Sequence, residues 1–115
     1  MTRQRPLSPH LQVYRPQLTS VMSISHRVTG AALTLGTFLL CLWLMALAAG
    51  DYWFSLATAV LAHPLGQIVL FGYSLALVYH ALNGLRHLSW DCGFCLTITG
   101  VYRSGQIVLL LTVVI

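Results

Sequence analysis

The sequence predicts an all-α protein, a bundle of membrane-spanning helices that forms one domain over residues 1–115. Of the 115 residues, 57% are hydrophobic and only 7% are charged, whereas soluble domains carry about 25% charged residues. Water could not hydrate such a surface on every side, so we expect membrane lipid to surround most of it. Backbone polar groups in a bilayer core must pair within the chain, which favours helices over open sheets.

The predicted elements follow one another along the chain. Residues 1–22, an N-terminal surface arm, hold three prolines and three arginines and have no helical period. The first span is predicted at about 23–49, because its uncharged part, Val28 to Ala49, is 22 residues long. At 1.5 Å per residue this part measures about 33 Å, against a hydrocarbon core of about 30 Å.

A short link over residues 50–63, with three interfacial aromatic residues, joins this span to a second one at about 64–90. Pro64 is tolerated at a helix start, where its missing N–H would be unpaired anyway. The third span is predicted at about 97–115 and is short, because the uncharged run after Arg103 covers only about 18 Å. Either its helix begins before Arg103, or the chain stops part-way through the membrane.

The basic residues predict the orientation of these spans. All six are arginines: four precede the first uncharged run, two follow the uncharged part of the second span, and the link between the spans has none. Positive residues gather on the cytoplasmic or matrix side, so the N-terminus and the 86–103 segment are predicted to lie there. The net charge of +4 forms no basic stripe on a soluble face, and we expect no nucleic-acid partner. The arginines are Arg3, Arg5, Arg15, Arg27, Arg86 and Arg103.

A polar stripe runs along the inner half of the second span. At about 100° per residue, His80, Gly84, His87 and Asp91 fall on one face of a helix. The glycine leaves space beside His80 for another helix or for a flat cofactor, and a neutral imidazole is a strong axial ligand of haem iron. The alternative is a hydrogen bond between helices. No other histidine lies at the depth of His80, so a second haem ligand would have to come from a partner chain.

A second polar group precedes the first uncharged run, in the stretch "SISHRVTG". Ser23 and Arg27 are one turn apart and share a helix face. Arg27 could pair with a haem propionate, or Ser23 and Arg27 could together bind a quinone carbonyl oxygen. Alternatively, Ser23 caps the helix and Arg27 only marks the membrane boundary. His87 and Asp91 could supply protons to such a site or form a surface ion pair.

Three motifs in this order closely resemble the cytochrome b large membrane-anchor subunits of succinate dehydrogenase, respiratory Complex II. They are R-P-L-S-P-H-L at residues 5–11, S-x-x-H-R-x-T at residues 23–29 and H-x-x-x-G-x-R-H-x-x-x-D at residues 80–91. The resemblance implies a three-helix subunit in a bacterial cytoplasmic membrane or a mitochondrial inner membrane. It implies a small anchor subunit, an iron–sulfur subunit and a flavoprotein with FAD as partners.

The resemblance also implies roles for single residues. His80 would be one axial ligand of haem b, with the other supplied by the small anchor subunit, and Ser23 and Arg27 would line the ubiquinone site. Apart from the resemblance, His26, together with His87 and Asp91, could support the haem propionates or a proton relay. The chain would catalyse nothing alone, but would serve succinate:ubiquinone oxidoreduction in the respiratory chain and the tricarboxylic acid cycle.

Two alternative functions remain open at the level of sequence. One is an anchor of quinol:fumarate reductase, although such anchors often ligate two haems within one chain. The other is a structural membrane anchor without a cofactor. The three cysteines form no disulfide framework, and the C-x-x-C pair at Cys92 and Cys95 lacks the surroundings of a redox or zinc site. We therefore expect no chemical role for these cysteines.

Overall fold

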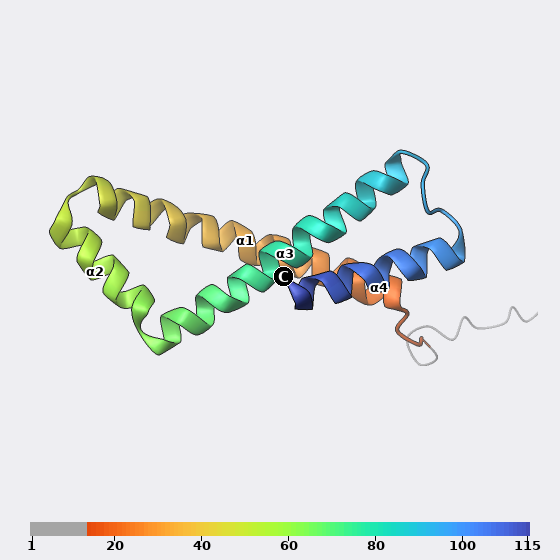
Figure 1. Ribbon diagram of the computed structural model, residues 1–115, viewed down its shortest axis with the longest axis horizontal. Coiled ribbons are helices and arrows are strands. Elements are labelled where there is room, and N and C mark those ends of the chain that lie inside the picture. The colour runs from red at the N-terminus through yellow and green to blue at the C-terminus, as the bar shows by residue number, and fades with distance from the viewer. Residues whose placement is uncertain (1–13) are drawn as a thin grey trace, which may run out of the picture.

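The computed structural model describes residues 14–115, which fold into α-helices joined by short connections (Figure 1). The described residues contain no strand, so the all-α prediction is confirmed. The predicted surface arm falls mostly on residues 1–13, outside the described residues. The helices are α1 (Leu18–Ala48), α2 (Asp51–Ala62), α3 (Pro64–Asp91) and α4 (Ile98–Val114).

Two of these helices are long and apolar enough to cross a membrane. α1 has 31 residues and α3 has 28, so they measure about 46 Å and about 42 Å. The most apolar 18-residue windows of α1 and α3 have mean hydropathies of 2.1 and 1.5. α4 is shorter, with 17 residues, and it begins five residues before Arg103. Of the two explanations for the short third run, the earlier helix start is therefore the one observed.

The helix boundaries differ from the prediction in two places. α1 begins at Leu18, inside the segment predicted as the surface arm, because no proline follows Pro16 in that part of the chain. The link predicted at 50–63 contains the twelve-residue helix α2. Gly50 adopts a φ of 105°, which separates α2 from α1, and Asp51 places a negative charge at the positive end of the α2 dipole.

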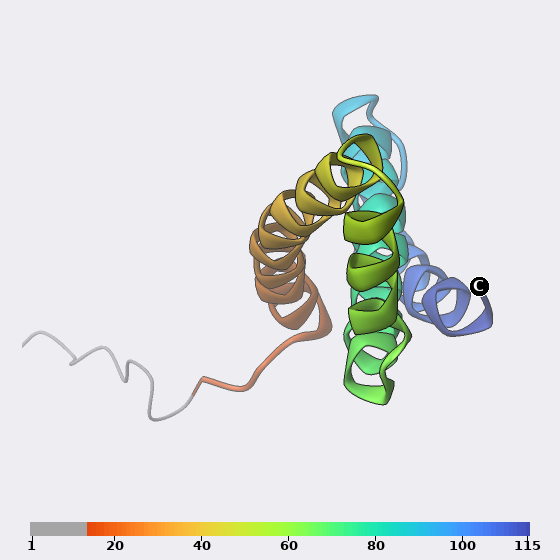
Figure 2. The ribbon, with the colours of Figure 1, turned by 90° about the vertical axis from the view of Figure 1, so that its left-hand side faces the viewer.

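The molecule has two ends at which different parts of the helices pack together, and we call them the apolar end and the polar end. At the apolar end, the second half of α1, all of α2 and the first half of α3 form three sides of a triangle (Figure 1). An apolar cavity of about 290 Å³ lies between them, with Trp43 and Tyr73 in its lining. At the polar end, α3 lies between the first half of α1 and α4 (Figure 2). The small core of Met22, Tyr79 and Val108 is buried there.

Most large hydrophobic side chains elsewhere on the described helices are exposed. Leu35, Phe38 and Met45 on α1 are each about two-thirds exposed, and Phe71 on α3 is 66% exposed. A soluble monomer rarely exposes apolar surface on this scale. The exposed apolar surface therefore fits the lipid environment that the composition predicts.

Candidate functional site

The imidazole of His80 lies where α3 crosses α1. Its Nδ1 is 3.1 Å from the backbone carbonyl oxygen of His26 and 3.1 Å from the hydroxyl oxygen of Thr29. A carbonyl oxygen can only accept a hydrogen bond, so Nδ1 must carry the proton and donate it. The lone pair of the neutral ring is then on Nε2. No hydrogen bond within residues 14–115 uses that Nε2 atom.

Three of the predicted site residues meet in what we call the histidine cluster: His26, His80 and His87. The rings of His26 and His80 stack with their centroids 3.9 Å apart and their planes inclined by 11°. The ring of His87 approaches His26 edge-on, with a centroid distance of 5.1 Å. Nδ1 of His26 is buried and has no hydrogen-bond partner among the described residues. The cluster thus offers one free lone pair, on His80, and one unpaired ring nitrogen, on His26.

Three glycines, one on α1 and two on α3, determine how closely other groups can approach His80. A Cβ added to Gly30 of α1 would lie 3.0 Å from Cε1 of His80, so the imidazole packs directly against the α1 backbone. A Cβ added to Gly84 or Gly72, on the same side of α3 as His80, would meet nothing within 4 Å. On the side that faces α1, the predicted stripe of α3 is therefore covered by the α1 backbone. Beside Gly84 and Gly72 no other atoms of the described residues fill the space. A flat ligand could approach there.

The residues of the site that the structure describes do not form a metal centre by themselves. The described residues contain no group of three or more His, Cys, Asp or Glu side chains that could hold a metal ion. Any metal bound by His80 would therefore need ligands from outside the described residues. A group that brings its own ligands, such as a porphyrin, meets this requirement.

In the described structure, no hydrogen bond joins the other predicted site residues, Ser23, Arg27 and Asp91, to the histidine cluster. Ser23 is half-buried and Arg27 is exposed, and neither side chain makes a hydrogen bond within the described part of the chain. Asp91 is exposed at the end of α3. His87 packs its ring edge-on against Trp90, with a centroid distance of 5.0 Å. No ion pair joins His87 to Asp91 in the described structure, so the surface ion pair considered from the sequence is not formed.

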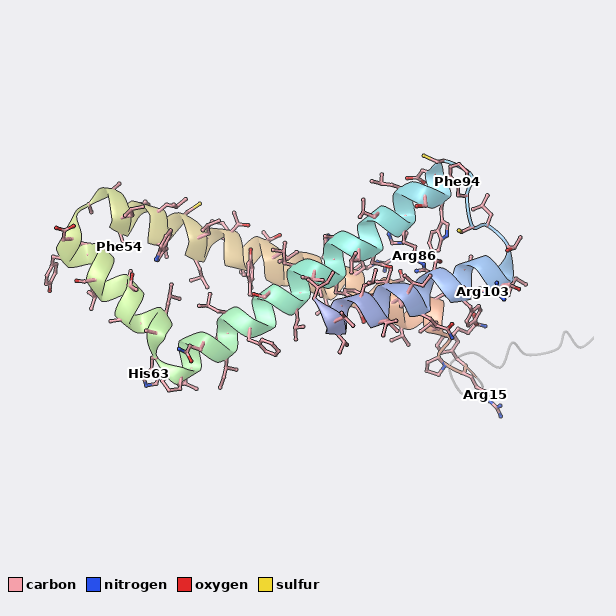
Figure 3. The ribbon with its side chains drawn as sticks, viewed as in Figure 1. Arg15, Phe54, His63, Arg86, Phe94 and Arg103 are labelled. Atoms are coloured by element: carbon pink, nitrogen blue, oxygen red, sulfur yellow. The ribbon has the colours of Figure 1, made fainter. Side chains whose placement is uncertain are left out.

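Arg86 is a residue of the polar end that the sequence reasoning missed, because it counted this arginine only as an orientation marker. Arg86 is 5% exposed and lies in the angle between α3 and α4 (Figure 3). Its Nε donates to the hydroxyl of Ser104 at 3.0 Å, and its Nη2 donates to the carbonyl of Val101 at 2.8 Å. Its Nη1 donates to Oδ1 of Asn83 at 3.2 Å, and the guanidinium lies 4.2 Å from the centre of the Trp90 ring.

The spacing of Arg86 and its neighbours on α3 could have identified Arg86 as a buried residue. Asn83, Arg86 and Trp90 are three and four residues apart, so they share one face of α3. Asn83 is fully buried. Tyr79, one turn earlier, donates its hydroxyl to the carbonyl of Met22 at 2.8 Å and so ties α3 to α1. A row of hydrogen-bonding residues on one face of an apolar helix predicts a buried face.

Comparison with known proteins identifies the family. Residues 1–115 match the family model described as succinate dehydrogenase/fumarate reductase transmembrane subunit. The succinate dehydrogenase cytochrome b556 subunit of Paracoccus denitrificans is 47% identical over 102 residues, covering 89% of this chain and 78% of the relative. The cytochrome b560 subunit of Marchantia polymorpha is 44% identical over 114 residues, covering 95% of this chain and 83% of the relative.

A mitochondrial relative gives the same result. The succinate dehydrogenase cytochrome b560 subunit of Sus scrofa is 44% identical over 113 residues, covering 95% of this chain and 66% of the relative. The bacterial and the mitochondrial relatives both match along nearly the whole chain. The chain therefore belongs to the family of succinate dehydrogenase/fumarate reductase transmembrane subunits, as a membrane-anchor subunit of the succinate dehydrogenase cytochrome b kind.

Proposed function

We propose that this chain holds haem b through His80 and contributes Ser23 and Arg27 to a ubiquinone-reduction site of succinate dehydrogenase. The observation that carries the haem assignment is the hydrogen bond from Nδ1 of His80 to the carbonyl of His26. Histidines that bind metals typically donate their other ring N–H to a backbone carbonyl or a carboxylate. That bond leaves Nε2 of His80 with the lone pair that an iron ligand needs.

The surroundings of His80 fit a haem. The face beside Gly84 is uncrowded, and the buried Nδ1 of His26 lacks a partner among residues 14–115, as expected for a group that meets an external acceptor. A propionate oxygen is such an acceptor, and Arg27, the next residue of α1, could pair with another propionate oxygen. When bound, haem supplies a one-electron redox centre. The second axial ligand would come from the small anchor subunit, since no other described histidine is free at this depth.

The quinone assignment rests on the chemistry and position of Ser23 and Arg27. They lie one turn apart on α1, at the polar end, and the segment that carries them also supplies His26 to the histidine cluster. A hydroxyl and a guanidinium can both donate to one quinone carbonyl oxygen. The positive charge of Arg27 then stabilises the negative charge that reduction places on this oxygen. His87 and the exposed Asp91, one turn apart on α3, could deliver protons from the surface.

The complete enzyme would need further subunits. Electrons from succinate would pass through FAD in the flavoprotein and the clusters of the iron–sulfur subunit before they reach ubiquinone near Arg27. These subunits would dock at the polar end, on the cytoplasmic or matrix side, where the arginine bias places Arg86 and the N-terminal segment. The chain alone would catalyse no reaction, because the flavin and the clusters would belong to the partner subunits.

The test of the haem assignment is a reduced-minus-oxidised absorption spectrum of the purified, complete assembly. His80→Ala should remove or shift the b-type haem signal, since the iron loses one axial ligand. His63→Ala is the matched control: His63 is the N-cap residue directly before α3, at the apolar end, far from Arg86 and the polar end in Figure 3. An unchanged spectrum in His80→Ala would contradict the ligand assignment. A wild-type assembly without any haem signal would favour a structural anchor instead.

A further inference from the structure

We propose that Thr29 is a positioning residue that orients and tunes His80 as a haem ligand. The proposal rests on the assignment of His80 in the preceding section and adds a residue of α1 to it. Thr29 is 51 positions away from His80 in the sequence, yet its hydroxyl oxygen lies 3.1 Å from Nδ1 of His80. Thr29 contacts Nδ1 of His80, whereas the proposed ligand atom is Nε2, so its effect would act through the imidazole.

The hydrogen-bond network determines the direction of this contact. The hydroxyl of Thr29 lies 2.8 Å from the carbonyl of Ser25 and 3.0 Å from the carbonyl of His26. A hydroxyl has one proton, and both of these carbonyls can only accept it. The Thr29 oxygen is thereby free to accept the proton on Nδ1 of His80, which it shares with the carbonyl of His26. Thr29 thus stabilises the tautomer that leaves the lone pair on Nε2.

The packing holds the ring in one orientation. The second torsion angle of a histidine side chain is intrinsically broad, so a ligand ring needs external restraint. The ring of His26 covers one face of His80 at 3.9 Å, and the backbone at Gly30 limits the movement of its Cε1 edge. With Nδ1 held by two acceptors, rotation of the ring would break both hydrogen bonds. This arrangement directs Nε2 before haem binds.

A hydrogen bond accepted from Nδ1–H also makes the imidazole a stronger electron donor. Such outer-shell partners typically change metal affinity by about 10–100-fold. A more basic ligand favours the oxidised iron, which carries the higher charge. Thr29→Val removes one of two acceptors and keeps the side-chain shape, so we expect the preference for oxidised over reduced haem to fall about tenfold. For one electron this corresponds to a midpoint potential about 59 mV more positive.

The experiment compares three variants in the complete, purified assembly: Thr29→Val, Thr29→Ser and Thr37→Val. Thr29→Ser keeps the hydroxyl. Thr37→Val is the matched control, because Thr37 makes the same kind of bond to the carbonyl four residues earlier, is exposed and has no contact with a histidine. Two quantities are measured: the haem midpoint potential by redox titration, and the affinity of the haem-depleted assembly for added haem.

The proposal expects Thr29→Val to raise the potential and weaken haem binding, while Thr29→Ser and Thr37→Val stay close to wild type. A wild-type potential and affinity in Thr29→Val would overturn it and leave His80 as the ligand. Equal haem loss in Thr29→Val and Thr29→Ser would also overturn it, because the hydroxyl would then not be the cause. If His80→Ala instead keeps the wild-type haem spectrum, the proposed ligand itself is wrong, which is a separate failure.

Discussion

Replacement of Arg86 by alanine should destabilise the polar end of the molecule more than any other loss of a single charge. The guanidinium is 5% exposed and donates hydrogen bonds to Ser104 and Val101 of α4 and to Asn83 of its own helix. The side-chain hydrogen bonds between α3 and α4 in the described structure all come from this one residue. Arg86→Ala therefore removes the polar connection between α3 and α4 at once.

The magnitude follows from the groups that the guanidinium leaves behind. Oδ1 of the fully buried Asn83 loses its one partner among the described residues, which costs about 1–3 kcal/mol. The Ser104 hydroxyl and the Val101 carbonyl each lose one hydrogen bond, worth about 1 kcal/mol, but stay bonded to each other. The cation–π contact with Trp90 adds about 1 kcal/mol. Removal of a desolvated charge returns several kcal/mol. We expect a net loss of about 2–4 kcal/mol in the free energy of unfolding.

Reversible unfolding of the detergent-purified assembly in mixed micelles, followed by circular dichroism, would measure this loss. Arg103→Ala is the matched control, because Arg103 carries the same charge on the same part of the molecule and its side chain is exposed. Arg86→Lys keeps the charge but not the planar fork, and it should fall between wild type and Arg86→Ala. Equal stabilities of Arg86→Ala and Arg103→Ala would refute the reasoning.

Two further substitutions test the helix crossing and the quinone site. Gly36→Ala should cost about 1–3 kcal/mol, because the added Cβ would overlap the ring of Tyr73; Gly72→Ala, which meets open space, should be neutral in the same unfolding assay. Arg27→Ala should reduce electron transfer to ubiquinone at least tenfold more than transfer to a soluble dye that accepts electrons upstream. Arg15→Ala, which also removes an exposed positive charge, should change neither rate, and equal losses in both Arg27→Ala assays would indicate defective assembly.

The long apolar spans could be predicted from the sequence because a helix that crosses a bilayer needs an uncharged run as long as the hydrocarbon core is thick. The long runs in α1 and α3 and the shorter run in α4 could be read from the positions of charged residues alone. The helix α2 could not be predicted in this way, because its twelve residues are too few to span a membrane and its aromatic residues also suit an interfacial link. Its start depends on the backbone angle at Gly50, which no composition reveals.

The candidate site was predicted residue by residue, but its geometry was not. His26 and His80 were each singled out, yet their stacking joins positions 54 apart and depends on how α1 crosses α3. Thr29 belongs to the S-x-x-H-R-x-T motif, but nothing in the sequence predicted its contact with His80, because a threonine in an apolar helix usually bonds only to its own backbone. Arg86 was misjudged because a buried arginine and a boundary arginine look alike in a list of charges. Only the partners supplied by α4 distinguish them.

The polar and apolar ends differ in the kind of contact that holds their helices together. Every side-chain hydrogen bond between helices in the described chain lies at the polar end, whereas α1, α2 and α3 meet at the apolar end mainly through apolar side chains. In lipid, such apolar contacts compete with equally favourable contacts to acyl chains. The apolar end can therefore tilt or spread as the bilayer thickens or thins, at a modest energetic cost. Membrane composition then strains α2 and its neighbours first and leaves the histidine cluster undisturbed.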